Sequence, residues 1–301
     1  MKVVAVIPAR LASTRLPRKM LHKIAGEPLL AWVYQGVRRC SSLDQVVVAT
    51  DSEEILAFCK QRGFVARMTS AEHRSGTERV HEISTLIPAD VYLNVQGDEP
   101  LTRPEHIDSL IELMRAADVQ VGTLKTPAAE IDVNNPSAVK VVTDSTGRAL
   151  YFSRATIPFD RDGAGPRYYK HLGFYAYRKD ALERFVRSSE SSLERSERLE
   201  QLRFLENGVP IYVAETPFDT VGVDTEHDVR RVEEILKGLQ KSDCRSESLT
   251  SGCGRSSAPW PRLQPQPLVS RSPDESGKTI RPIATEFSQR GSARPTCSST
   301  K

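Results

Sequence analysis

Short continuous apolar runs alternate with segments of helical spacing over residues 3–117. The clearest runs lie at residues 3–7, 45–50 and 91–95. Strands of a parallel sheet are covered by helices on both faces, so runs that are apolar at nearly every position predict buried strands. Helices are expected between and after these runs, at residues 29–39, 52–62, 77–86 and 104–117. This alternation predicts a three-layer α/β domain.

The pattern changes after about residue 135. Apolar runs at 139–143 and 148–152 flank Asp-Ser-Thr-Gly, a sequence typical of a hairpin turn. The elements expected after this hairpin are a strand at 171–177, helices at 179–186 and 193–206, a strand at 210–214 and a closing helix at 225–239. Their order predicts an inserted α+β cap, formed by about residues 135–215, over the open edge of the sheet.

The composition changes again near residue 240. Residues 241–301 contain 13 Ser and 7 Pro, but Val, Ile, Leu, Met, Phe, Trp and Tyr together number only eight. Such a segment buries too little apolar surface to offset the entropy that is lost on ordering. We therefore expect one folded region at 1–240 and a disordered, functionally silent tail at 241–301.

Charge is divided unevenly between these two parts. The tail holds 10 Lys and Arg against 5 Asp and Glu, and subtracting these from the totals of 42 and 39 leaves 32 basic and 34 acidic residues in the body. A slightly acidic body is not suited to binding nucleic acid. No apolar stretch approaches the roughly 18 residues that a membrane span requires, and the chain opens into a strand pattern rather than a cleavable leader. We expect a cytoplasmic protein with neither nucleic acid nor membrane as a partner.

Basic side chains follow the first predicted strand. The loop at residues 8–19 combines small residues and two hydroxyls with four basic side chains, Arg10, Arg15, Arg18 and Lys19. In an open α/β sheet, ligands bind beyond the carboxyl ends of the strands, and basic side chains with exposed amides there form a cradle for phosphates. The loop lacks the spacing of a Walker sequence or of a Gly-x-Gly-x-x-Gly fingerprint. A phosphate-binding loop and a solvated basic loop both remain open.

Two aspartates stand where an α/β enzyme can hold a magnesium ion. Asp98 follows the third predicted strand and a glycine, and Asp224 follows a short apolar run at 221–223. Mg²⁺ usually takes one or two protein carboxylates and completes its shell with water and phosphate oxygens. An aspartate before a helix is also a common N-cap, and Asp224 precedes the expected closing helix. The sequence alone leaves both roles open.

Seven motifs occur together and in order along the chain. They are Pro-Ala-Arg-x-x-Ser-Thr-Arg-Leu-Pro-x-Lys at 8–19, His-x-Ser-Gly-Thr-Glu-Arg at 73–79, Asn-Val-Gln-Gly-Asp-Glu-Pro at 94–100, Ala-Leu-Tyr-Phe-Ser-Arg-Ala-Thr-Ile-Pro at 149–158, His-Leu-Gly at 171–173, Leu-Glu-Gln-Leu-Arg at 199–203 and Gly-Val-Asp-Thr at 222–225. Each motif is weak alone, but the set closely resembles the 3-deoxy-manno-octulosonate cytidylyltransferases, also called CMP-Kdo synthetases. The resemblance spans about residues 2–238. It implies a three-layer α/β/α nucleotidyltransferase sheet of the Rossmann-like kind with an inserted α+β cap.

The resemblance also implies an activity and a set of site residues. Members of the family transfer CMP from CTP to the sugar acid Kdo, release pyrophosphate and so activate the sugar for lipopolysaccharide assembly. Lys19, Asp98 and Asp224 are implied as catalytic, with the two aspartates as ligands of Mg²⁺. The residues implied for nucleotide binding are Pro8, Ala9, Arg10, Ser13, Arg15, Lys19, Arg74 and Ser75. Those implied for the sugar acid are Gln96, Arg154, Arg161, His171, Tyr175, Glu200 and Gln201.

Several alternatives stay open at this point. Tyr175, in an alternating strand, can pack in the core, and Glu200, on a charged helix, can face solvent. A cytidylyltransferase for another acidic sugar, such as a sialic acid, would use the same phosphate chemistry, and a nucleotide sensor could keep the fold without the reaction. The sequence points to no general base. The family resemblance also implies a homodimer.

Overall fold

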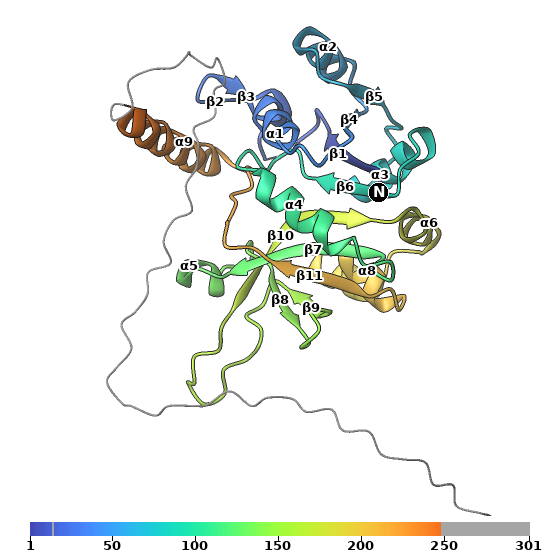
Figure 1. Ribbon diagram of the computed structural model, residues 1–301. Helices are drawn as coiled ribbons and strands as arrows, with labels where there is room; N and C mark the ends of the chain where they lie inside the picture. Colours follow the sequence, from blue (N-terminus) through green and yellow to red (C-terminus); the bar gives the residue numbers. More distant parts are fainter. Residues whose placement is uncertain (14, 248–301) are drawn as a thin grey trace, which may run out of the picture. The chain divides into compact units, whose positions relative to one another are not determined.

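The computed structural model describes residues 1–13 and 15–247, which form a central sheet flanked by helices (Figure 1). Within these residues the sheet has nine strands, and its main path runs β11-β7-β10-β6-β1-β4-β5, with β8 paired to both β10 and β9. The strands are β1 (Val3–Ala9), β4 (Gln45–Thr50), β5 (Ala66–Met68), β6 (Val91–Val95), β7 (Val121–Pro127), β8 (Lys140–Thr143), β9 (Ala149–Ser153), β10 (Tyr169–Tyr177) and β11 (Ile211–Glu215). A separate two-stranded ribbon consists of β2 (Lys23–Ile24) and β3 (Glu27–Pro28).

The direction of pairing divides the sheet into two halves. Strands β5, β4, β1 and β6 pair in parallel. Strand β10 lies antiparallel to both β6 and β7, and β11 runs parallel to β7. The carboxyl ends of β1, β4 and β6 therefore meet at one edge of the sheet, which is the edge where open α/β sheets bind ligands.

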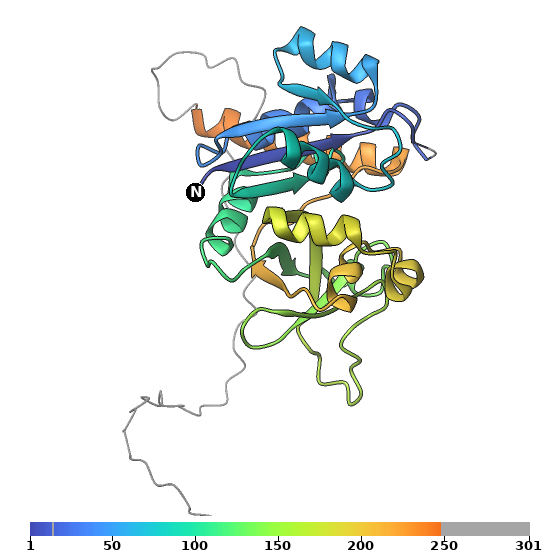
Figure 2. The same cartoon turned by 90° about the vertical axis from the view of Figure 1, so that its right-hand side faces the viewer.

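Helices cover both faces of the sheet, as Figure 2 shows from the side. In chain order they are the 3-10 helix η1 (Lys19–Leu21) and α1 (Leu29–Arg38), α2 (Glu53–Arg62), α3 (Gly76–Leu86), α4 (Pro104–Leu113), α5 (Glu130–Val133), α6 (Lys179–Arg187), α7 (Ser192–Glu197), α8 (Gln201–Glu206) and α9 (Glu226–Glu247). In β1, Val3, Ala5 and Ile7 pack with residues of α1, α2, α4 and α9, whereas Val4 and Val6 pack with residues of α3, α6 and α8. Successive side chains of a strand point to opposite faces, so the core consists of two layers on either side of one sheet.

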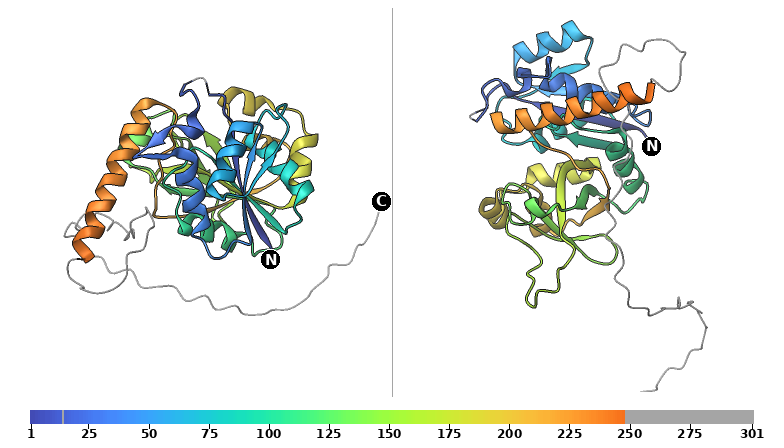
Figure 3. Two further views of the ribbon diagram at one scale, coloured as in Figure 1. Left: turned by 90° about the horizontal axis from the view of Figure 1, so that it is seen from above. Right: turned by 90° about the vertical axis from the view of Figure 1, so that its left-hand side faces the viewer.

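The final helix packs beside N-terminal elements. Figure 3 shows α9, coloured orange, next to the blue region of the chain, where the backbone N–H of Ala25 donates to Glu233 Oε1 at 2.9 Å. Val229, Val232 and Leu236 of α9 are buried in the same layer as α1. Among the described residues, no helix combines the length and the apolar character needed to cross a membrane.

The α/β class and the clearest elements were predicted correctly from the sequence. Strands β1, β4 and β6 fall on the three continuous apolar runs. Helices α1, α2 and α3 begin and end within one residue of the expected positions. The hairpin of β8 and β9 and the strand β10 are also present where the pattern places them.

Strand β7 is absent from the sequence prediction. Gly122 and Lys125 interrupt its apolar pattern and Pro127 ends it, yet six of its seven residues are buried. It lies between β10 and β11, and Lys125 donates to Thr143 Oγ1 at 2.8 Å. Burial between two neighbouring strands rather than residue preference therefore makes this segment a strand.

The predicted cap over 135–215 requires a correction. Strand β10 lies between β6 and β7, and β11 forms an edge of the same sheet, so both strands belong to the sheet itself. Phe174 of β10 is buried in one layer of the core, and Tyr175 and Tyr177 are buried in the other. A strand that is buried on both faces is part of the core rather than of a cap over it.

Two helices differ from their expected bounds because side chains or backbone geometry interrupt them. Helix α4 ends at Leu113 rather than at 117, since the Arg178 guanidinium donates hydrogen bonds to the carbonyl oxygens of Met114, Ala116 and Val119. The helix expected at 193–206 is two helices, α7 and α8, because Arg198 adopts a left-handed conformation with φ of 55°.

The closing helix is longer than predicted. Helix α9 continues to Glu247, past the boundary expected at residue 240. The remaining part of the expected tail, residues 248–301, lies outside the described residues, so its disorder stays a prediction.

Candidate active site

The loop after β1 brings a lysine to the carboxyl edge of the sheet. Ser13 Oγ accepts a hydrogen bond from the backbone N–H of Leu16 at 3.3 Å, which closes a turn within the loop. Arg18 then adopts a left-handed conformation with φ of 56°, and its guanidinium pairs with Glu54 of α2. The 3-10 helix η1 starts directly afterwards, so Lys19 is the first residue of a hydrogen-bonded turn.

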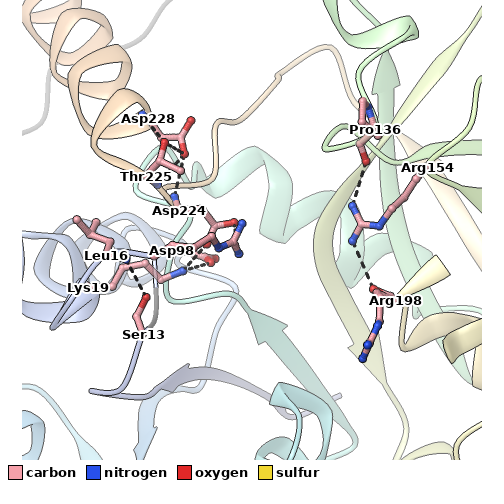
Figure 4. A network of polar contacts seen from close by, with 11 residues as sticks. Ser13, Leu16, Lys19, Asp98, Pro136, Arg154, Arg198, Asp224, Thr225 and Asp228 are labelled. Carbon is pink, nitrogen blue, oxygen red and sulfur yellow. Dashed lines mark hydrogen bonds and ion pairs between the residues drawn. The ribbon is translucent and has the colours of Figure 1, made fainter. Parts of the chain in front are cut away.

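The Lys19 ammonium lies between two carboxylates that are far apart in the sequence. It is 2.7 Å from Asp98 Oδ2 and 2.9 Å from Asp224 Oδ1 (Figure 4). The Lys19 side chain is only 12% exposed, whereas those of Asp98 and Asp224 are 29% and 39% exposed. Burial alone would lower the pKa of Lys19, but the two carboxylates outweigh it and raise that pKa above its usual 10.5. Lys19 is therefore a permanent cation in this site.

Close backbone contacts hold the two carboxylates together. Asp98 follows Gly97, and a Cβ atom at position 97 would lie 2.7 Å from the carbonyl oxygen of Pro8 and 2.8 Å from Met20 Sδ. Only glycine allows the end of β6 to approach the loop after β1 so closely. The backbone N–H of Val223 donates to the carbonyl oxygen of Asp98 at 2.9 Å, which brings the segment carrying Asp224 beside the end of β6.

The structure separates the two roles that the sequence left open for Asp224. Helix α9 is capped by Thr225 and Asp228: Asp228 Oδ2 accepts from the backbone N–H of Thr225 at 2.9 Å, and Thr225 Oγ1 accepts from that of Asp228 at 3.3 Å. Asp228 Oδ2 also accepts from the backbone N–H of Asp224 at 3.1 Å. These reciprocal hydrogen bonds satisfy backbone N–H groups at the start of α9. The carboxylate of Asp224 is therefore not the cap, and it is directed at Lys19 and Arg15 instead.

The basic loop lines an open cavity of about 580 Å³. Its lining residues are Leu11, Ala12, Ser13, Pro17, Arg18, Asp51 and Ser52. Arg15, in the same loop, lies 2.9 Å from Asp224 Oδ2 and is largely exposed. Residues of the same basic loop therefore reach both the cavity and the carboxylate pair, which suits a bound polyanion.

The segment at 69–79 approaches the same edge of the sheet through the start of α3. Ser75 is the N-cap of α3, and its hydroxyl accepts from the backbone N–H of Glu78 at 3.1 Å. The backbone N–H of Arg74 donates to Glu78 Oε2 at 2.6 Å. A Cβ atom on Gly76 would be 3.5 Å from Pro8 and 3.6 Å from Gln96 Oε1. The positions expected to contact the nucleotide therefore meet the ends of β1 and β6.

His171 and Tyr175, expected to bind the sugar, are buried on β10. His171 Nε2 lies 2.9 Å from Thr123 Oγ1, and burial lowers the pKa of His171 to about 3, so its ring is neutral. The rings of His171 and Tyr175 are 5.4 Å apart between centroids, and Tyr175 stacks on Tyr177 at 5.8 Å. Tyr175 therefore packs in the core, which is one of the roles that the sequence left open. A sugar contact for His171 or Tyr175 stays a prediction.

Glu200 contacts the start of α3 rather than facing solvent, and its neighbour Gln201 is buried. Glu200 Oε2 accepts from Thr77 Oγ1 at 3.0 Å, and burial raises the pKa of Glu200. Gln201 is buried, and within residues 1–13 and 15–247 its Nε2 has no hydrogen-bond partner. Gln96 is close to both Gly76 and Gly173, so it lies between α3 and β10.

The two arginines expected to bind the sugar carboxylate are not brought to the carboxylate pair. Figure 4 shows Arg154 apart from Lys19, with its guanidinium directed at Pro136 and Arg198. Its Nε donates to the carbonyl oxygen of Glu197 at 2.7 Å and its Nη1 to that of Pro136 at 3.0 Å. Arg161 is 88% exposed and lies 3.7 Å from its neighbour Asp162. A role for either in sugar binding stays a prediction.

Comparison with known proteins places this geometry in a family. The sequence profile of the cytidylyltransferase family matches residues 4–213. The chain is 66% identical over 237 residues to a 3-deoxy-manno-octulosonate cytidylyltransferase of Koribacter versatilis, covering 78% of this chain and 90% of that protein. It is 56% identical over 242 residues to the protein of the same name from Acidobacterium capsulatum, covering 80% and 99%. The chain belongs to the 3-deoxy-manno-octulosonate cytidylyltransferase family.

Solved structures agree with the family assignment. A CMP:2-keto-3-deoxy-manno-octonic acid synthetase complexed with CTP superposes with a TM-score of 0.76 at 39% identity, covering 79% of this chain and 99% of that one. The 4-diphosphocytidyl-2C-methyl-D-erythritol synthase from Anaerococcus prevotii superposes with a TM-score of 0.55 at 16% identity, covering 78% and 96%. The second likeness concerns the fold alone.

The carboxylates of Asp98 and Asp224 are the groups in this site that could hold the expected Mg²⁺. Asp98 and Asp224 already share one cation, the Lys19 ammonium, and both keep exposed surface for further ligands. In the described part of the chain, no group of three or more His, Cys, Asp and Glu side chains forms a metal site. Because Mg²⁺ usually takes only one or two protein carboxylates, the pair fits that ion.

Sequence reasoning missed two side chains at this edge of the sheet. Asp51, directly after β4, lines the cavity and pairs with the buried Arg79 of α3. Its place after a buried strand is the same signal that identified Asp98. Thr77 donates to Glu200 and lies 3.4 Å from Tyr177 Oη. Thr77 belongs to a family motif, but its position alone does not reveal a partner 123 residues away.

Proposed function

We propose that this protein transfers CMP from CTP to 3-deoxy-manno-octulosonate and releases pyrophosphate, giving the activated sugar for lipopolysaccharide assembly. The observation that carries the proposal is the convergence of Lys19, Asp98 and Asp224 beside the basic loop. The 66% identity to a named cytidylyltransferase supports the choice of reaction.

The charge of the site suits phosphoryl transfer. The attacking oxygen and the leaving pyrophosphate must lie in line across the α-phosphorus, and catalysis consists mostly of alignment and charge stabilisation. Asp98 and Asp224 raise the pKa of Lys19 and so keep its ammonium protonated. Arg15 is a second cation, and it pairs with Asp224. Lys19 and Arg15 would bind and orient the triphosphate, together with the amides of the loop that carries Ser13.

Asp98 and Asp224 would hold the divalent cation. When bound, Mg²⁺ supplies positive charge to the phosphate oxygens. The two carboxylates come from the ends of different segments, β6 and the connection before α9, and both already face a common cation. Their fixed positions would orient the phosphates toward the attacking hydroxyl.

The sugar acid would bind on the side of the site that contains Gln96. This residue lies between Gly76 of α3 and Gly173 of β10, and Glu200 is anchored nearby on Thr77. Amide and carboxylate groups in partly buried positions suit the hydroxyl groups of a sugar, since a polar group left unpaired on burial is costly. We retain His171, Tyr175, Gln201, Arg154 and Arg161 as proposed sugar-binding residues on the family resemblance.

A pyrophosphate-release assay with CTP, Mg²⁺ and Kdo tests the reaction. Release is expected only when CTP, the metal and Kdo are all present, and it should be much slower when a sialic acid replaces Kdo. Faster release with the sialic acid would identify a different acidic sugar as substrate. CTP binding without release under either sugar would contradict the enzymatic proposal and favour a nucleotide sensor.

The family resemblance further supports a homodimer that acts in the cytoplasm. Sedimentation velocity of the full chain tests the assembly, and a dimer is the expected species. A monomer at the concentrations used in the activity assay would contradict this part of the proposal.

A further inference from the structure

The segment that carries Asp224 has no regular secondary structure of its own. It connects the end of β11 to the start of α9, between Glu215 and Glu226. Its first residue is anchored by the backbone N–H of Thr216, which donates to the carbonyl oxygen of Lys125 at 2.9 Å. Near its end, the N–H of Val223 donates to the carbonyl oxygen of Asp98. A connection of this kind needs a further anchor if Asp224 is to keep one position, because each residue left free has conformational entropy.

One anchor in the middle of the segment is the carbonyl oxygen of Phe218, which lies 3.0 Å from His106 Nε2. A second is the pair Glu99–Thr220. Thr220 is buried, and its hydroxyl donates to Glu99 Oε2 at 2.6 Å. The other carboxylate oxygen, Oε1, lies against the same segment, since a Cβ atom on Gly222 would be 3.4 Å from it. A Cβ atom on Gly173 of β10 would be 3.8 Å from the same oxygen. The carboxylate of Glu99 is thus enclosed between β10 and the segment.

Lys170 of β10 binds the backbone of Thr220. Its ammonium donates to the carbonyl oxygen of Thr220 at 3.1 Å and to Asp219 Oδ1 at 2.9 Å. Thr220 is therefore fixed through its side chain by Glu99 and through its backbone by Lys170. Hydrogen bonds that a charged ammonium donates are stronger than those between neutral groups, so the Lys170 contacts, together with the Glu99–Thr220 bond, favour one position of the segment.

We propose that Glu99 and Thr220 are positioning residues that keep Asp224 opposite Asp98. The two adjacent acidic residues of the Gly-Asp-Glu-Pro motif then have separate tasks: Asp98 faces the Lys19 ammonium, and Glu99 holds the segment that delivers Asp224. Neither Glu99 nor Thr220 needs to touch substrate for this role. The inference rests on the proposed function, because it treats the carboxylate pair as the cation site.

The test compares Thr220→Val, which removes the donor at nearly unchanged volume, with Thr220→Ser, which keeps it. The first measurement is hydrogen exchange in the ligand-free protein. Thr220→Val should lose protection at the backbone amide of Val223, while the amides of β1 and β6 keep theirs. Thr220→Ser should behave as the wild type. Unchanged protection at Val223 in Thr220→Val, or an equal loss in β1 and β6, would overturn the positioning role.

The second measurement is Mn²⁺ binding by electron paramagnetic resonance in the presence of CTP. Loss of a group that orients a metal ligand typically weakens metal affinity by about 10–100-fold, so Thr220→Val is expected to bind Mn²⁺ at least about tenfold more weakly than Thr220→Ser. Equal affinities in the two variants, with normal binding by the wild type, would overturn this inference alone. A wild type that binds no Mn²⁺ would contradict the proposed cation site and, with it, this inference.

Discussion

The Lys19 ammonium donates a hydrogen bond to Asp98 Oδ2 at 2.7 Å, although 79 positions separate the two residues in the chain. Lys19 starts η1 beyond the end of β1, and Asp98 follows β6, which pairs with β1 in parallel. The contact therefore joins the carboxyl ends of two adjacent strands. The site therefore holds two carboxylates and a cation close together before any ligand arrives.

Asp98→Asn should fold normally and turn over CTP and Kdo about a hundredfold more slowly, or worse. Asparagine keeps the shape of the side chain but removes its charge, and the loss of one preorganised electrostatic partner typically costs a factor of about 10²–10³ in turnover. Steady-state pyrophosphate release at saturating substrates measures the effect.

Asp90→Asn is the matched control for this substitution. Asp90 accepts from the backbone N–H of Lys2 at 2.6 Å and precedes β6, whereas Asp98 follows it. The control is therefore at the opposite end of the same strand and should keep near-normal turnover. Comparable turnover in Asp98→Asn and Asp90→Asn would argue against any role of Asp98 at the phosphates.

Arg79→Met should lower the free energy of unfolding by about 3–5 kcal/mol. Arg79 is fully buried, pairs with Asp51 and donates to Thr69 Oγ1 at 2.5 Å. Removing one partner of a buried ion pair typically costs about 3–5 kcal/mol, and because the Asp51 side chain left behind is 20% exposed, the lower end of that range is expected. Urea denaturation followed by circular dichroism provides the measurement.

Arg62→Met provides the comparison for the buried pair. Arg62 pairs with Glu27 at 2.8 Å, and both side chains are partly exposed. Exposed ion pairs contribute only about 0–1 kcal/mol, so this variant should unfold close to the wild-type midpoint. If the two variants lost equal stability, the Arg79–Asp51 pair would have no special importance for the fold.

The position of Asp98 at the carboxyl edge of the sheet was predictable from local sequence rules. Asp98 follows a continuous apolar run and a glycine, so its place at a strand end is readable from the sequence alone. The proximity of Asp224 to Asp98 cannot be read from the sequence alone. It depends on the backbone contact between Val223 and Asp98 and on the cap formed by Thr225 and Asp228. The family resemblance implied that Asp98 and Asp224 act together, and the structure shows the contacts that bring them close.

Predictions failed where tertiary contacts override the local pattern. Strand β7 contains Gly122 and Lys125, and it is buried by its neighbours β10 and β11 and by Leu113 of α4. The sugar-binding role expected of Arg154 stays a prediction, but nothing in the sequence indicated that its guanidinium binds the backbone carbonyls of Glu197 and Pro136. No spacing rule links an arginine to carbonyl groups that distant segments provide. Such residues become interpretable only when the chain is seen folded.

Two buried histidines should make a contribution to stability that is lost as the pH falls from about 6.5 to about 4. Burial lowers the pKa of His106 to about 4 and that of His171 to about 3. His106 Nδ1 accepts from the backbone N–H of Arg103 at 3.3 Å, and Nε2 lies 3.0 Å from the carbonyl oxygen of Phe218. The folded state therefore requires the neutral ring of His106.

The sign of the pH effect follows from these pKa values. The unfolded chain takes up protons at these rings near pH 6.5, before the folded protein does, so the contribution to stability is complete above pH 6.5 and decreases as the pH falls toward 4. Each ring adds a slope of up to about 1.4 kcal/mol per pH unit. Urea midpoints from pH 7 to 4 measure it, and His106→Gln should flatten the slope whereas the exposed His227→Gln should not. Identical slopes in both variants would contradict the role of His106.

Deleting residues 248–301 should leave turnover and the melting temperature unchanged. Among the side chains of α9 whose burial is described, Val232 and Leu236 are the last buried ones, and they come before this boundary; ending the chain at Glu247 therefore keeps every packing contact described for the helix. Ending it at Arg231 instead removes both side chains. Since loss of a large buried aliphatic group typically costs about 2–5 kcal/mol, the shorter variant should melt at a clearly lower temperature. A fall in turnover or in melting temperature for the longer variant would show that residues 248–301 contribute to the enzyme and are not silent.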